Sequence, residues 1–295
     1  MSGVQVWWIV LGAASAINVL GWLWTASALH RHREVFGPHH VRLRRQQLAL
    51  SAVYVLGCAW RSAFPLFDVP RVCLFDAWTS TVIVGRSVAT LAELAFVAQW
   101  VLLLREVGRA ARSRIGPVAA AAVFGMIVVA ETFSWYAVLT RSNFGHVVEE
   151  SLWGASAVAI VVYLLALWPQ CDARLRVLIG AIGAAGLAYI AFMFIVDVPM
   201  YWSRWSAELA RGQAPLDIAD GILDAARPCT VSFDWSHWRA EIPWMSMYFT
   251  VAVWVSIGFV HIPLLEPRDG VTRRGLPRVG LRPWGRYPSA RVAGA

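Results

Sequence analysis

The stretch PVAAAAVFGMIVVAETFSWYAVLT, residues 117–140, decides the fold class of this protein. It carries one charged residue, Glu131, in an otherwise uncharged and mostly apolar run. A helix needs roughly 20 apolar residues to cross the hydrocarbon core of a bilayer, so this run predicts a transmembrane helix. A carboxylate inside such a helix is costly and is usually kept for a function or an ion pair.

Comparable runs recur along the chain, at 4–29, 47–67, 78–104, 150–168, 177–197 and 245–265. The 295 residues are 58% hydrophobic and only 15% charged, whereas typical soluble domains are about 25% charged. We therefore expect an all-α polytopic membrane bundle with seven transmembrane helices. Residues 1–265 would form this single domain. The composition excludes a soluble protein and a disordered one.

The positive charges of the chain predict its orientation. All 26 of them are Arg. Of these, 18 lie in loops after the odd-numbered spans or in the C-terminal tail, and 6 lie on the opposite side. Since cytoplasmic loops retain positive charge, the N-terminus is expected outside and the C-terminus in the cytoplasm. This asymmetry explains the net charge of +8 without a nucleic-acid partner, and the bilayer is the expected partner.

The residue usage of the chain excludes some cofactors and indicates the kind of source organism. The chain has no Lys, and a retinal or pyridoxal-phosphate Schiff base needs a lysine amine. Both of these cofactors are therefore excluded, and the remaining cofactor question is open. Exclusive use of Arg, with abundant Ala, Gly and Val, is typical of a GC-rich bacterial genome. We accordingly expect a multi-pass protein of the bacterial inner membrane.

Two segments outside the spans are expected to differ in character. Residues 198–244 form one long outer loop, which we expect to cover the bundle like a lid and to contain a short helix. Residues 266–295 form a basic cytoplasmic tail that is expected to be disordered. The alternative for the tail is a polybasic segment held on anionic lipid.

Cys73 and Cys229 both fall in loops on the predicted outer side. An oxidising exterior permits a disulfide between them, which would tie the long loop to the loop after the second span. The alternative is that they are two unrelated buried thiols.

Charged residues within the predicted spans suggest a polar cluster. Two arginines and two glutamates lie between the outer face and the membrane centre and are expected to form paired networks around an outward-facing cavity. Thr90 shares a helical face with two of them, and Asp197 lies at the outer end of the sixth span. The intramembrane set is Arg61, Arg86, Thr90, Glu93, Glu131 and Asp197. The alternative is that these ion pairs only fix helix packing.

A second constellation is predicted at the outer surface. His146, Glu149 and Glu150 precede the fifth span, and Asp234 and His237 precede the seventh. Imidazole and carboxylate groups together are ligands for a divalent metal. The alternative is that the acids only cap a helix N-terminus.

Three functions remain open from the sequence. The first is binding or translocation of a small polar or ionic solute in the outward-facing cavity. The second is an integral-membrane enzyme, possibly metal-dependent, that acts on a lipid or an exported substrate at the outer face. The third is an accessory subunit of a larger membrane complex, and a homo-oligomer is also compatible with the sequence.

Overall fold

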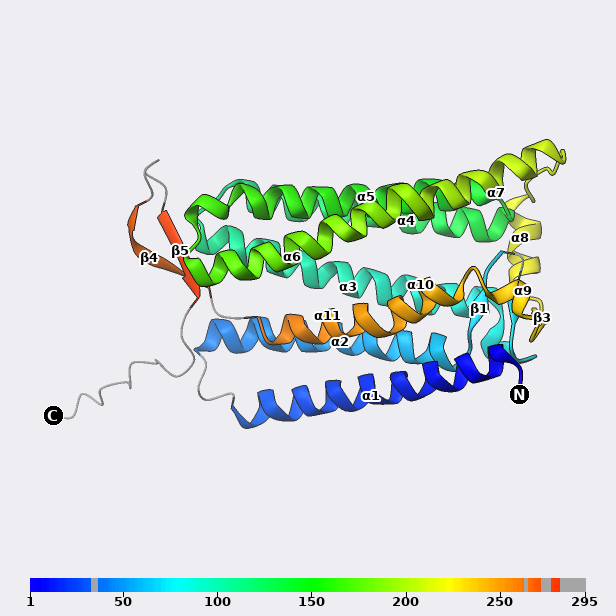
Figure 1. Cartoon of the computed structure of the whole chain (residues 1–295), viewed down its shortest axis with the longest axis horizontal. Helices are drawn as coiled ribbons and strands as arrows, with labels where there is room; N and C mark the ends of the chain where they lie inside the picture. Colours follow the sequence, from blue (N-terminus) through cyan, green and yellow to red (C-terminus); the bar gives the residue numbers. More distant parts are fainter. Residues whose placement is uncertain (33–36, 70, 263–264, 272–276, 282–295) are drawn as a thin grey trace.

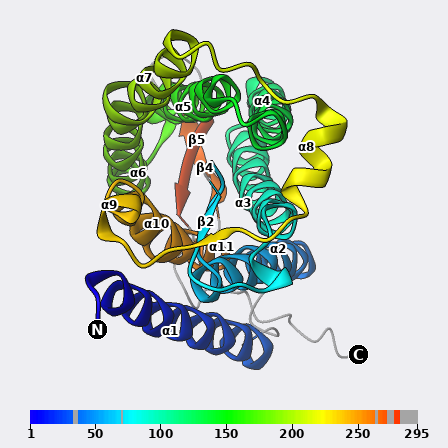
Figure 2. The same ribbon diagram turned by 90° about the vertical axis from the view of Figure 1, so that its right-hand side faces the viewer.

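The computed structural model describes residues 1–32, 37–69, 71–262, 265–271 and 277–281. Long, roughly aligned helices make up the bundle (Figure 1). They are α1 (Gly3–Arg31), α2 (Pro38–Ala63), α3 (Val82–Ala110), α4 (Ile115–Thr140), α5 (Asn143–Ala166) and α6 (Ala173–Phe192). Viewed along the bundle, α2 to α6 and α11 (Val253–Val260) surround a common centre, and α1 lies outside them against α2 and α11 (Figure 2).

Two of the long helices contain a π-helical turn. α6 continues through η4 (Met193–Asp197) into α7 (Val198–Ala210), and α10 (Ile242–Met247) continues through η5 (Tyr248–Ala252) into α11. The sequence predicted that the sixth span ends at residue 197. In the structure the helix continues past this residue to Ala210. Pro199 lies in the first turn of α7 and has no N–H to donate, and the wider π turn before it lets the helix continue.

Six helices of the described chain are long and apolar enough to cross a membrane. They are α1, α3, α4, Asn143–Gln170, Ala173–Ala210 and Ile242–Val260. The predicted membrane-type helical bundle is thereby confirmed. The predicted second span corresponds to α2, which is not among the six because its first turns carry the polar sequence HHVRLRRQQ.

Two helices, α5 and α3, start at residues other than those that the sequence predicted. α5 begins at Asn143, one residue after Ser142, whose Oγ accepts the backbone N–H of Phe144. Such a side-chain cap satisfies a donor that would otherwise lack a partner. His146, Glu149 and Glu150 consequently lie in the first turns of α5 and not in a loop before it. α3 begins at residue 82, after the 3-10 turn η2 (Trp78–Ser80).

One end of the bundle, which we call the disulfide end, carries a small sheet. β2 (Val72–Cys73) pairs antiparallel with β1 (Leu66–Phe67) and parallel with β3 (Thr230–Val231). The predicted disulfide is present between Cys73 and Cys229, with a Cα–Cα distance of 5.9 Å. The sheet and the disulfide together hold the 198–244 segment to the α2–α3 loop.

The 198–244 segment is more ordered than a loop. Its short helix α8 (Ile218–Ala225) packs on the flank of α4 so closely that a Cβ on Gly221 would lie 2.1 Å from the carbonyl oxygen of Leu139. Asp224 of α8 forms ion pairs with Arg71 (2.9 Å) and Arg141 (2.7 Å). The chain then crosses the end of the bundle (Figure 2) and reaches α9 (Trp235–Trp238), which packs against α1.

The opposite end, which we call the hairpin end, closes with two strands. β4 (Leu265–Val271) and β5 (Pro277–Leu281) pair antiparallel, and the Asp172 N–H donates to the carbonyl of Val279 (2.8 Å). The tail was expected to be disordered from residue 266, and its described residues form these two strands. Residues 272–276 and 282–295 of the predicted tail lie outside the described residues.

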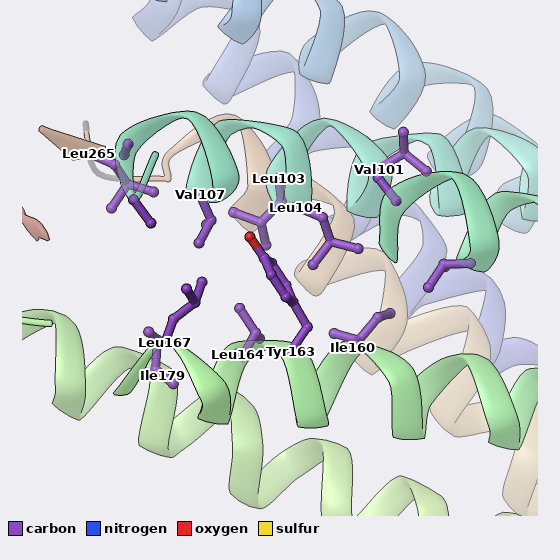
Figure 3. Packing of buried hydrophobic residues seen from close by; sticks show 14 of the residues in the cluster. Val101, Leu103, Leu104, Val107, Ile160, Tyr163, Leu164, Leu167, Ile179 and Leu265 are labelled. Carbon is purple, nitrogen blue, oxygen red and sulfur yellow. The ribbon is translucent and has the colours of Figure 1, made fainter. Parts of the chain in front are cut away.

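One large cluster of buried apolar side chains fills the half of the bundle toward the hairpin end. Tyr163 of α5 lies among Leu103, Leu104 and Val107 of α3 (Figure 3). Gly116 makes room for this ring, because a Cβ there would lie 2.6 Å from the tyrosine hydroxyl. Toward the disulfide end, further apolar clusters are present, and polar side chains lie between α3, α4 and α5.

Candidate functional site

The candidate site lies between α3, α4, α5 and η5, in the half toward the disulfide end. Arg86, Thr90 and Glu93 come from successive turns of α3 and share one face, as their i, i+4, i+7 spacing requires. α4 contributes Glu131, and α5 contributes Glu149.

Arg86 is the centre of the site. Its Nη2 lies 2.5 Å from Glu93 Oε2 and 2.8 Å from Glu131 Oε2. Its Nη1 lies 3.6 Å from Glu149 Oε1. One guanidinium therefore faces three carboxylates from three helices. We call these four residues the Arg86 cluster.

Thr90 connects the cluster to a tryptophan. The indole Nε1 of Trp135 donates to Thr90 Oγ1 (3.1 Å), and Thr90 Oγ1 donates to Glu131 Oε2 (2.6 Å). Trp135 lies one turn after Glu131 on α4. These bonds fix the orientation of the Glu131 carboxylate relative to α3.

The first residue of the π turn η5 also reaches the cluster. Tyr248 donates its hydroxyl hydrogen to Glu93 Oε1 at 3.0 Å. Both oxygens of Glu93 are thus engaged, one by Arg86 and the other by Tyr248. π turns are frequent at functional sites, and η5 supplies the Tyr248 hydroxyl to this one.

Glu149 has its own partner on α5. The Nδ1 of His146 lies 2.8 Å from Glu149 Oε2, one turn away on the same helix. The His146 ring is 4.9 Å from the ring of Tyr201, measured between centroids. The histidine therefore orients the third carboxylate of the cluster.

The cluster contains more acidic than basic groups. Three carboxyl groups face one guanidinium group, so full ionisation would leave a net charge of −2. Arg86 is only 6% exposed, and Glu131 and Glu149 are each 4% exposed. One oxygen of each glutamate lies within 4.8 Å of those of the other two. Such an excess of buried charge is expensive unless a proton or a cation compensates it.

Further acidic residues follow one another from the cluster toward the disulfide end. Glu150 of α5 is close enough to Glu149 and Asp197 to interact with both electrostatically. Asp197, the last residue of η4, is in turn within electrostatic range of Glu241. Glu241 is paired with Arg204 at 2.9 Å.

The structure brings together four of the six residues predicted for the intramembrane set. Arg86, Thr90, Glu93 and Glu131 are in direct contact. Arg61 has another partner, with its Nη1 3.5 Å from Asp68. Of the two predicted arginines, Arg86 is the one paired with the two glutamates in the described part of the chain.

Several residues of the site were not predicted as part of it. Glu149 joins the cluster because α5 starts earlier than its apolar run indicated, and a serine cap signal at residue 142 could have shown this. Trp135 and Tyr248 carry no local signal, since both are aromatic residues in apolar spans. Within the cluster the side chains contact one another directly.

The predicted outer metal set does not come together. Asp234 accepts the N–H of Ser236 as the cap of α9, and His237 Nδ1 lies 2.8 Å from Ser232 Oγ. Both side chains belong to the segment that packs against α1. Glu149 belongs instead to the Arg86 cluster, and His146 contacts Glu149.

Comparisons with protein-family models, with curated proteins and with solved structures find no match to this chain. The argument for function therefore depends on the geometry of the Arg86 cluster.

Proposed function

We propose that this protein binds or translocates a small cationic solute at the Arg86 cluster, as a seven-span protein of the bacterial inner membrane. The observation that carries the proposal is the surplus of two carboxyl groups over guanidinium groups among the side chains of this cluster. Ionisable groups at membrane depth are by default functional, and an excess of carboxylates favours a proton or a cation as the ligand.

Other ion pairs in the same protein support this choice over a purely structural one. Arg61 pairs with Asp68, Arg204 pairs with Glu241, and Asp224 is shared by two arginines. In none of these ion pairs do the carboxylates outnumber the guanidinium groups. The Arg86 cluster differs, because its carboxyl groups outnumber its guanidinium group by two.

The orientation completes the proposal. The hairpin end holds the arginine-rich loops and belongs in the cytoplasm by the positive-inside rule. The disulfide end would then face outside, where an oxidising environment maintains the bond between Cys73 and Cys229. α2 serves as the seventh span. A solute would reach the cluster from outside, past Asp197 and Glu150.

One observation favours an enzyme as the second candidate. The His146–Glu149 pair, at 2.8 Å, has the composition of a general base and its orienting carboxylate. A lipid or an exported substrate at the outer face would be its substrate class.

Uptake into proteoliposomes tests the proposed function. Purified full-length protein is reconstituted, and entry of protons, Na⁺ and Mn²⁺ is followed with ion-sensitive dyes. We expect Glu131→Gln to abolish uptake of at least one of these ions. Glu106→Gln is the matched control, since Glu106 lies on α3 toward the hairpin end and pairs with Arg109. Absence of both uptake and binding for all three ions would refute the proposal.

A further inference from the structure

We propose that Glu93, Glu131 and Glu149 form a binding site for one divalent cation with a preference for oxygen ligands, such as Mn²⁺ or Ca²⁺. The inference depends on the proposed function, because it names the class of solute that the Arg86 cluster takes.

The spacing of the carboxylates fits such an ion. One oxygen from each lies within 4.8 Å of the other two. Ca²⁺ binds oxygen ligands at about 2.3–2.6 Å, so two ligands on opposite sides of the ion are up to about 5 Å apart. The three glutamates therefore reach one ion with little movement. Ligand sets made of carboxylates favour Mn²⁺, Mg²⁺ and Ca²⁺ over softer metals.

Glu131 provides an independent indication of a ligand. Its Oε2 accepts hydrogen bonds from Arg86 and Thr90, whereas its Oε1 is buried and has no hydrogen-bond partner among the described residues. The residue as a whole is 4% exposed. Because a buried polar atom without a partner is costly, this oxygen is available for a cation.

The charge of the ion matches the charge of the site. Three ionised carboxylates, one guanidinium and one divalent cation together make the buried cluster neutral. In this structure Arg86 holds two of the carboxylates at 2.5 and 2.8 Å. An entering ion competes with the guanidinium for these oxygens, while the hydrogen bond from Arg86 Nε to Thr90 Oγ1 (3.4 Å) does not involve them.

His146 acts as a positioning residue. Its Nδ1 holds Glu149 Oε2, which leaves Oε1 directed toward the cluster, 3.6 Å from Arg86 Nη1. Partners of this kind fix the geometry of a ligating carboxylate. The weaker contact of Arg86 with Glu149 identifies this carboxylate as the first that an ion would engage.

Manganese binding tests the inference directly. Chelator-treated full-length protein in nanodiscs is titrated with MnCl₂, and free Mn²⁺ is measured by electron paramagnetic resonance. We expect one bound Mn²⁺ per chain, displaced by Ca²⁺. Glu131→Gln and Glu149→Gln should each weaken binding at least tenfold, whereas Glu106→Gln should bind as the unmodified protein does. Glu149→Gln is the safer variant for folding, because its contact with Arg86 is the longest of the three.

The outcomes separate this inference from the proposed function. If neither Mn²⁺ nor Ca²⁺ binds while Glu131-dependent uptake of protons or Na⁺ persists, the divalent site is wrong and the proposed function stands. Mn²⁺ binding that is equal in both glutamate variants and in the unmodified protein also overturns the site. If no ion binds and none is taken up, both proposals fail.

Discussion

Replacement of Arg86 by Gln should be among the most destabilising single changes in the protein. It removes the guanidinium that lies 2.5 Å from Glu93 and 2.8 Å from Glu131. Three carboxyl groups then share a buried place without their guanidinium partner. Removing one partner of a buried ion pair costs about 3–5 kcal/mol. A loss of this size lowers the melting temperature by on the order of 10 °C.

The two free cysteines provide the assay. Cys58 and Cys171 are both buried, and burial raises the pKa of the Cys171 thiol to about 11. Since only the thiolate reacts, a thiol-reactive dye should label the folded protein slowly at pH 8 and the unfolded protein rapidly. Melting curves followed by this dye, with a metal chelator present, give the stability of each variant.

A second variant distinguishes charge imbalance from loss of packing. Arg86→Gln/Glu131→Gln also removes one of the carboxyl groups that lost its partner, so it should melt at a higher temperature than Arg86→Gln alone. The control is Arg109→Gln on the same helix, because the Arg109 side chain is 50% exposed and such a pair contributes about 0–1 kcal/mol. The reasoning is refuted if Arg86→Gln and Arg109→Gln melt alike, or if the double variant is the least stable of all.

Three further predictions concern the two ends of the bundle. Single cysteines introduced at Arg109 and Ser206 should be labelled only from the cytoplasm and only from outside, respectively, and the reverse result would invert the proposed orientation. Replacing Cys73 and Cys229 by Ser should lower the free energy of unfolding by about 2–5 kcal/mol, as for other long disulfide loops; unchanged thermal melting would contradict the tethering role. Asp224→Ala leaves two guanidinium groups without their carboxylate and should cost about 3 kcal/mol; melting like that of the unmodified protein would show that α8 is held by apolar packing.

The extent of the helical bundle could be predicted from apolar runs, but the ends of its helices could not. An apolar run ends where the membrane environment ends, whereas a helix ends where its backbone finds other partners. Ser142 caps α5 several residues before the apolar run begins, and α7 continues the sixth helix past Pro199. Both differences lengthen helices at the disulfide end.

The candidate site was predictable to the extent that it follows helical periodicity. Arg86, Thr90 and Glu93 are linked by their spacing on one helix, whatever surrounds them. The partners from other helices depend on rotation about each helix axis, which short sequence patterns do not specify. The sequence grouped Arg61 with Arg86, whereas in the structure Glu149 is the additional charged residue beside Arg86 and Arg61 pairs with Asp68.

The two π turns explain why this rotation is hard to predict and why the cluster has its present composition. A π turn holds one residue more than an α-helical turn, so it changes which side chains face inward beyond it. η5 begins at Tyr248, which donates to Glu93, and η4 ends at Asp197, on the proposed route to the cluster. The carbonyl of Phe249 in η5 accepts a hydrogen bond from the buried amide of Asn18 at 2.8 Å. α1, although outside the ring of helices, thereby supports the turn that supplies a hydroxyl group to the site.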